Sequence, residues 1–242
     1  MPDIFDDLTA EYEQLDGVLA GLTAGQWVHP SAAAGWTVAD VVLHLTQSEE
    51  LIAAAIAGDL VADQRAGRVD AWADDFVAAE RGVDPTDLLA RWRAAAFATP
   101  AALRTRPRGT RLQWITNRIS PAALATTRLA EHWAHGHDIT DALGIPYPDT
   151  GRLRHIAWLG HRTLPYAFGV EGIEGGPVYC ELTAPDGRTW QFGEPDAPST
   201  ITGPAGEFCR VAARRMAPAD STLKATGPHG PQALAVLRTY AV

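Results

Sequence analysis

In several segments of the first 170 residues, apolar residues recur at steps of three and four, which is the pattern of amphipathic helices. The first such stripe lies within residues 4–22 and consists of Ile4, Leu8, Tyr12, Leu15, Leu19 and Leu22. Residues 23–35 interrupt the periodicity and are predicted to be a connection. A second helix opens with Thr37 as its N-cap and ends at Gly58, and Asp40 completes an acidic variant of the capping box.

The longest predicted helix begins at Ser120 and ends at Gly144. Ser is a good N-cap, Pro121 suits the first helical position, and glycine commonly ends a helix. Three further helices are predicted over residues 70–81, 85–97 and 152–168. The polar residues 59–70, which follow the second helix, are expected to form a loop or a short helix.

The periodicity changes to two after residue 170, which is typical of strands. Residues 178–183 and 188–192 flank a Pro-Asp-Gly turn and predict a β-hairpin. Further strands are predicted over 199–203 and 222–226, with helices over 204–216 and from residue 232. The sequence therefore predicts an α+β protein with two domains: a helical bundle over residues 1–170 and a small α+β domain over residues 171–242.

The net charge and the cysteine content limit the kinds of molecule that the protein is expected to bind. The 242 residues carry a formal net charge of −9, which argues against nucleic acid or an anionic membrane. No apolar run approaches the ~18 residues of a membrane span, and no signal peptide is recognisable. Two cysteines provide no disulfide framework, so a cytoplasmic protein acting on a small molecule is expected, as a monomer or a homodimer.

The long helix carries candidate metal ligands. Glu131 and His135 are four residues apart, so they share one helix face on which a carboxylate and an imidazole can bind one divalent cation. The alternative is an ordinary solvated helix pair. Asp138 lies one turn further, as a support for the ligands or as an acid/base. His137 faces away, and Asp141 is its expected partner.

A third ligand is available on the second helix. His44 lies beside the apolar stripe, where it is either a hydrogen-bonded core residue or the third ligand. Two histidines and one carboxylate from two helices would form an open site, with positions left for water or substrate. Glu49 and Glu50 follow on the same helix, either as supports for the site or as a solvated face.

Five arginines lie within residues 104–118. They are either solvated loop charges or a clamp for anionic groups, because the arginine fork binds carboxylates in a bidentate manner. Arg111 and Arg118 are the clamp candidates, and Arg128, one turn before Glu131, is a third.

Three segments resemble the actinobacterial mycothiol-dependent maleylpyruvate isomerase family, part of the DinB-like metal-binding superfamily. They are GWTVADVVLHLTQSEE, RLAEHWAHGHDITDALG and YCELTAPDGRTWQFGEPDAPSTITGPAGEFCRVAARRMAPADSTLKATGP. The family patterns W-[ST]-x-x-D-x-x-x-H-L and E-x-x-x-H-x-x-D are matched by Trp36, Asp40, His44, Leu45, Glu131, His135 and Asp138. The resemblance implies a DinB-like up-down four-helix bundle with extra helices, and metal ligands at His44, Glu131 and His135.

The resemblance also implies a chemistry. The metal of this family is usually described as zinc, although two imidazoles and a carboxylate also accept nickel, iron or manganese. Its implied role is to activate mycothiol, whose thiolate attacks an electrophilic carbon. His132 and His137 depart from the pattern of relatives, and residues 104–119 lack a Pro-rich, aromatic segment.

Three functions remain open on the sequence. The first is a metal-dependent enzyme that activates mycothiol for addition, transfer or isomerisation on a small electrophilic, carboxylate-bearing metabolite. The second is a thiol-independent isomerase, lyase or cyclase of a secondary-metabolite pathway, in which the ion is a Lewis acid and Asp138 or His137 moves protons. The third is a non-catalytic protein that binds a metal or ligand.

Overall fold

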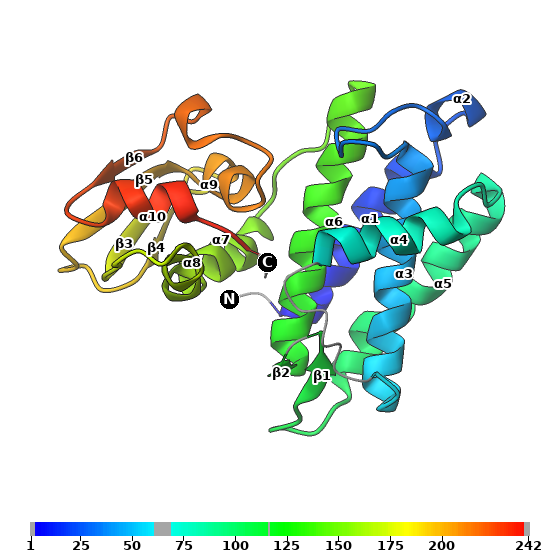
Figure 1. The fold of residues 1–242 in the computed structure, drawn as a ribbon, viewed down its shortest axis with the longest axis horizontal. Coiled ribbons are helices and arrows are strands. Elements are labelled where there is room, and N and C mark those ends of the chain that lie inside the picture. Colours follow the sequence, from blue (N-terminus) through cyan, green and yellow to red (C-terminus); the bar gives the residue numbers. More distant parts are fainter. Residues whose placement is uncertain (1–2, 61–68, 116, 240–242) are drawn as a thin grey trace. The chain divides into compact units, whose positions relative to one another are not determined.

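The computed structural model describes residues 3–60, 69–115 and 117–239 (Figure 1). It confirms the α+β class, with helices through the first part of the chain and a mixed sheet in the second. Two units can be separated, one extending to Tyr147 and the other starting at Pro148. Most of the polar stretch 59–70 lies outside the described residues. Among the described residues, no helix combines the length and the apolar character that a membrane crossing requires.

The first unit is built on a bundle of four long helices. They are α1 (Ile4–Leu19), α3 (Val38–Ala57), α5 (Pro85–Arg104) and α6 (Pro121–Leu143). Two shorter helices, α2 (Ala24–Trp27) and α4 (Val69–Glu80), and a hairpin of β1 (Leu112–Trp114) and β2 (Asn117–Ile119) complete it. Apolar residues of these helices form the bundle core, since Leu8, Leu15, Val41, Leu45 and Leu124 are fully buried.

The helices that carry the candidate site begin and end where the sequence predicts. Thr37 Oγ1 accepts from the Asp40 backbone N–H at 3.2 Å, and the Asp40 side chain accepts from the Thr37 backbone in return. Ser120 Oγ caps α6 by accepting from the Ala123 N–H at 3.1 Å. Gly144 ends α6 in the left-handed conformation at φ 65°. These caps fix where both helices begin and end.

Four predictions in the first unit need correction. The first helix ends at Leu19 instead of residue 22, and α2 forms inside the predicted connection because Thr23 and Gln26 make their own capping box. The helix predicted to end at residue 97 is α5, which continues past Pro100 to Arg104. Proline has no N–H and so removes one helical hydrogen bond, and burial of Leu103 in the core offsets this loss of stability. The arginine-rich segment predicted as a loop contains the β1–β2 hairpin.

The second unit is a four-stranded sheet with helices. Its strands are β3 (Val178–Thr183), β4 (Thr189–Phe192), β5 (Ser199–Pro204) and β6 (Lys224–Thr226), in the order β4-β3-β5-β6. Only the β3–β5 pair is parallel among these neighbours. The helices are α7 (Leu153–Arg162), α8 (Leu164–Glu171), α9 (Ala205–Ala212) and α10 (Gly230–Val236), with a 3-10 turn at Pro218–Asp220.

The second unit differs from the sequence prediction at its start. The helix predicted over residues 152–168 is divided at Thr163 into α7 and α8. Both belong to the unit that begins at Pro148, whereas the sequence placed the domain boundary after residue 170. The physical reason is packing: α7 lies against α9, and a Cβ at Gly160 would lie 3.2 Å from the Phe208 ring.

Candidate metal centre

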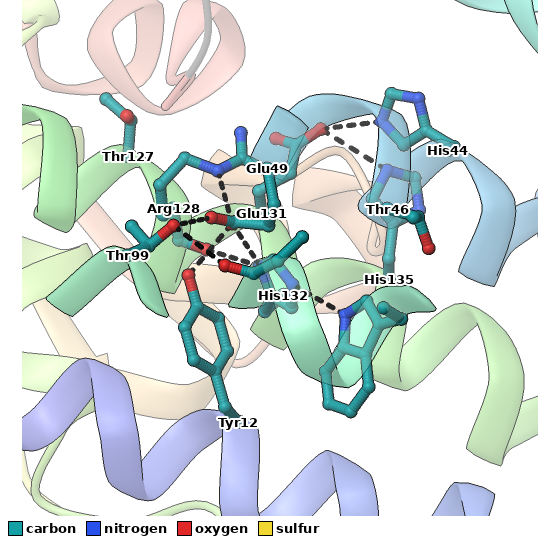
Figure 2. A network of polar contacts seen from close by, with 12 residues as sticks. Tyr12, His44, Thr46, Glu49, Thr99, Thr127, Arg128, Glu131, His132 and His135 are labelled. Atoms are coloured by element: carbon teal, nitrogen blue, oxygen red, sulfur yellow. Dashed lines mark hydrogen bonds and ion pairs between the residues drawn. The ribbon is translucent and has the colours of Figure 1, made fainter. Parts of the chain in front are cut away.

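His44 on α3 and the Glu131 and His135 side chains on α6 lie together in the bundle (Figure 2). Glu131 Oε1 is 3.1 Å from His44 Nε2 and 3.4 Å from His135 Nε2. One donor atom from each residue lies within 4.8 Å of the others. We call these three residues the ligand trio. The predicted juxtaposition of two helices that are far apart in sequence is therefore present.

The donor set of the ligand trio suits a divalent cation. Two neutral imidazole nitrogens and one carboxylate oxygen are ligands that zinc and other first-row metals accept. Among the described residues, the ligand trio is the full set of candidate ligands at this place. Three protein ligands are typical of metal sites that keep one coordination position open for water or substrate. Glu131 is about one-third exposed, so a small molecule has access to the group.

The environment sets the protonation of each member of the trio. Burial lowers the pKa of His44 and outweighs its hydrogen bond to Glu131. Burial would raise the pKa of the Glu131 carboxyl, but hydrogen bonds from both imidazoles hold it well below its usual range. Burial opposes the charge on His135 too, yet the carboxylates of Asp138 and Glu131 raise its pKa. The carboxylate is thus ionised and His44 is neutral, as a metal ligand must be.

Asp138 supports His135 from behind. Its Oδ2 lies 2.8 Å from His135 Nδ1, and the carboxylate is almost fully buried. The Asp138 carboxylate holds the ring in the orientation that turns Nε2 toward Glu131. With an ion bound, it would keep the remaining proton on Nδ1, which is how ligating histidines are usually oriented. The geometry favours the supporting role among the two that the sequence left open for Asp138.

Trp36 covers the two imidazoles. Its ring centroid is 5.1 Å from that of His44 and 6.2 Å from that of His135, and it is nearly parallel to His135. The indole Nε1 donates to Asp74 Oδ1 on α4 at 2.8 Å. The loop before Trp36 is fixed to α6 as well, because the Ala32 N–H donates to the Asp138 carbonyl at 2.8 Å.

A buried polar network adjoins the ligand trio and joins all four long helices (Figure 2). Glu49 on α3 is fully buried and accepts from Tyr12 Oη at 2.8 Å, Thr99 Oγ1 at 2.6 Å and Arg128 Nε at 3.0 Å. Beside it, burial and the Arg128 charge hold the pKa of His132 well below its usual range. The neutral His132 accepts from Trp92 Nε1 at 3.2 Å, while its Nδ1 is 3.0 Å from the Arg128 carbonyl.

The remaining candidates lie in different surroundings. Arg111 and Arg118 are exposed on or beside the hairpin, where Arg118 Nη2 donates to the Arg111 carbonyl at 2.9 Å. Arg128 is buried, so the three arginines do not form one exposed clamp. The His137 ring lies between the rings of Trp133 and Tyr147, and its Nδ1 is 3.4 Å from Asp141, the expected partner. His137 is not a member of the ligand trio.

Sequence reasoning missed the buried network, although its signal is present. Glu49 follows Leu45 by four residues and precedes Ile52 by three, so it occupies an apolar-stripe position. Arg128 stands in the same way four residues after Leu124. Glu50, by contrast, is partly exposed and pairs with Arg91 at 2.6 Å. The sequence left open whether Glu49 and Glu50 support the site or lie on a solvated helix face. The solvated face applies only to Glu50.

Comparison with known proteins finds one family model and two relatives of similar length. A family model described as the mycothiol maleylpyruvate isomerase N-terminal domain matches residues 8–140. Two proteins of Mycobacterium tuberculosis, from strains CDC 1551 / Oshkosh and ATCC 25618 / H37Rv, are each 36% identical to the chain. The match covers 97% of the chain and 94% of each relative, and both are described only as uncharacterized proteins.

Solved structures give the same fold. The crystal structure of the mycothiol-dependent maleylpyruvate isomerase has a TM-score of 0.64 to the chain, with 14% sequence identity. The match covers 96% of this chain and 97% of that one, and a histidine-to-alanine mutant of that enzyme matches equally well. At this identity the likeness shows that both the bundle and the second unit follow the fold of that structure.

Proposed function

The chain belongs to the mycothiol maleylpyruvate isomerase family, and from this we propose that it is a divalent-metal-dependent enzyme that uses mycothiol. Its reaction would be addition, transfer or isomerisation on a small electrophilic metabolite. The observation that carries the proposal is the ligand trio, in which two imidazoles and one carboxylate from α3 and α6 lie within 4.8 Å of one another. Family membership supports mycothiol as the thiol.

His44, Glu131 and His135 would hold the ion, with zinc as the expected metal and nickel, iron or manganese as alternatives. A bound divalent ion supplies Lewis acidity and keeps a coordinated thiol deprotonated near neutral pH. The protein's part would be to present an ionised Glu131 and a neutral His44, whereas at His135 the ion would compete with a proton. Asp138 would hold the proton on His135 Nδ1, and Trp36 packs against both imidazoles.

The test measures metal content and thiol binding separately. We expect the purified protein to contain about one divalent ion per chain and the variant His44→Ala to lose it, by plasma emission spectroscopy. The matched control is His29→Ala, an exposed histidine outside the trio. Unchanged metal content in His44→Ala would refute the site.

The thiol is tested by calorimetric titration of the metal-loaded protein with mycothiol. Heat of binding in the wild type, and its loss in His44→Ala, support the proposal. A metal-loaded protein that gives no heat, and whose activity toward electrophiles is independent of mycothiol, would favour thiol-independent Lewis-acid catalysis instead.

A further inference from the structure

We propose that the guanidinium of Arg128 binds an anionic group of the ligand that occupies the metal centre, and that this residue selects carboxylate-bearing ligands. The inference rests on the proposed function, because the ligand in question is one that reaches the trio. It assigns the anion-binding role to a buried residue of the bundle and not to the exposed arginines of the hairpin.

The first observation is the unused hydrogen-bonding capacity of Arg128. A guanidinium has five N–H donors, and within the described residues only Nε donates, to Glu49 Oε1 at 3.0 Å. The Nη2 atom is buried and has no hydrogen-bond partner there. Buried polar groups of native proteins are nearly always paired, because an unpaired one loses its hydration without compensation. Arg128 therefore presents donors that call for an acceptor.

The second observation is that Glu49 pairs with Arg128 through Nε and, among the described residues, not through Nη2. Its Oε1 already accepts from Tyr12 and Arg128 Nε, and its Oε2 accepts from Thr99. These bonds fix both the glutamate and the arginine in the interior of the bundle. Because the guanidinium is held through Nε, its Nη groups keep a fixed direction.

The third observation is the position of Arg128 beside the ligand trio. It precedes Glu131 by three residues on α6, so the two side chains share a helix face. Figure 2 shows the Arg128 guanidinium next to the Glu131 side chain. Its charge acts on the trio, since it contributes to lowering the pKa values of both Glu131 and His44. The ring of Trp114, on the hairpin, lies 6.0 Å from the guanidinium carbon.

An anionic group between Arg128 and the trio would satisfy these donors. A carboxylate matches the fork geometry of the guanidinium, and charge-assisted hydrogen bonds in a buried setting are strong. A ligand with one group at the ion and a carboxylate at Arg128 would be held at both ends. The exposed Arg111 and Arg118 lack such a setting, because water competes for their donors.

The experiment uses cobalt-substituted full-length protein and follows the cobalt absorption bands. The probes are acetate, which has one carboxylate, and malonate, succinate and glutarate, whose two carboxylates lie at increasing separation. Succinamide is the neutral probe. In the wild type we expect at least one dicarboxylate to bind more tightly than acetate and succinamide. Arg128→Gln should weaken that dicarboxylate roughly tenfold to a hundredfold and leave acetate unchanged.

Two further variants keep the test decisive. Arg128→Gln leaves Glu49 buried without its cation and can fail to fold, so the double variant Glu49→Gln/Arg128→Gln, which buries no charge at either position, is measured with it. Arg118→Gln is the matched control and should bind every probe like the wild type.

Each outcome decides between the two proposals. Failure of the wild type to bind cobalt would overturn the proposed function and this inference together. A cobalt-loaded wild type without preference for any dicarboxylate would overturn the inference alone, as would equal dicarboxylate affinity in the folded Arg128 variants. Equal affinity in these variants would mean that the Nη donors of Arg128 bind only water.

Discussion

His135 Nδ1 lies 2.8 Å from Asp138 Oδ2, one helical turn away on α6. The carboxylate holds the imidazole in the orientation that turns Nε2 toward Glu131, which is 3.4 Å away. Helix α6 thus supplies two members of the ligand trio and the support of one of them. The E-x-x-x-H-x-x-D spacing therefore places Glu131, His135 and Asp138 in contact on one helix face.

Asp138→Ala should weaken metal binding about 10- to 100-fold without changing the set of ligands, which is the usual cost of removing a carboxylate behind a ligating histidine. Affinity is measured by competition with a chromophoric chelator. The control is Asp141→Ala, because Asp141 is exposed and lies beside His137, outside the trio. Equal affinities in the wild type and Asp138→Ala would show that the hydrogen bond does not support the metal site.

Metal affinity should decline with falling pH, beginning above the ordinary histidine value of about 6.5. Burial opposes a charged His135, but the Asp138 and Glu131 carboxylates outweigh it and raise its pKa. A proton on His135 competes with the ion, so affinity is full above this raised pKa and is lost as pH falls through it. In Asp138→Ala the decline should move to lower pH. An unshifted profile would contradict the assignment of this titration to His135.

Glu49→Gln should destabilise the protein by about 3–5 kcal/mol, because it leaves the Arg128 charge buried without its partner. Glu50→Gln is the matched control on the next residue, whose partly exposed ion pair with Arg91 should be worth less than about 1 kcal/mol. Both are measured by urea unfolding. In a double-mutant cycle, Glu49→Gln/Arg128→Gln should lose less stability than the sum of the single variants. Additive losses would contradict a coupled pair.

The helices that carry the ligand trio could be predicted because local rules determine where they begin and end. The caps at Thr37, Ser120 and Gly144 fix the helix ends, and helical periodicity then fixes which side chains share a face. His44 required more than periodicity, since its meeting with Glu131 depends on the packing of α3 against α6. The sequence offered His44 as a third ligand beside a core alternative, and the family resemblance implied the same residue.

Other features depend on tertiary contacts that no local pattern contains. Pro100 suggests a helix end, yet the buried Leu103 retains α5 beyond it. Thr163 divides α7 from α8, and the close approach of Gly160 to Phe208 joins α7 to the sheet unit. The buried state of Glu49 arises from three donors on three other helices, which sequence spacing cannot bring together.

Trp36 and Asp74 form the last relationship that we expect to matter for the metal site. The indole covers both imidazoles of the trio, and its hydrogen bond to Asp74 is the link between α4 and this aromatic cover. Loss of the ring should expose the ligands to water and loosen their orientation. We therefore expect Trp36→Ala to speed dissociation of the ion roughly tenfold, as for other losses of support around ligands.

Trp36→Phe keeps an aromatic cover but removes the N–H donor, and Asp74→Ala removes the acceptor. Because both delete the same hydrogen bond, each should speed metal dissociation less than Trp36→Ala does, and the double variant should be no worse than either single one. Asp75→Ala, at the exposed neighbouring position, serves as the control. The rates follow from stopped-flow transfer of cobalt to a chelator. Additive effects of Trp36→Phe and Asp74→Ala would mean that the two residues act on the site independently. A wild-type rate of metal dissociation in Trp36→Ala would show that the indole does not affect the metal site.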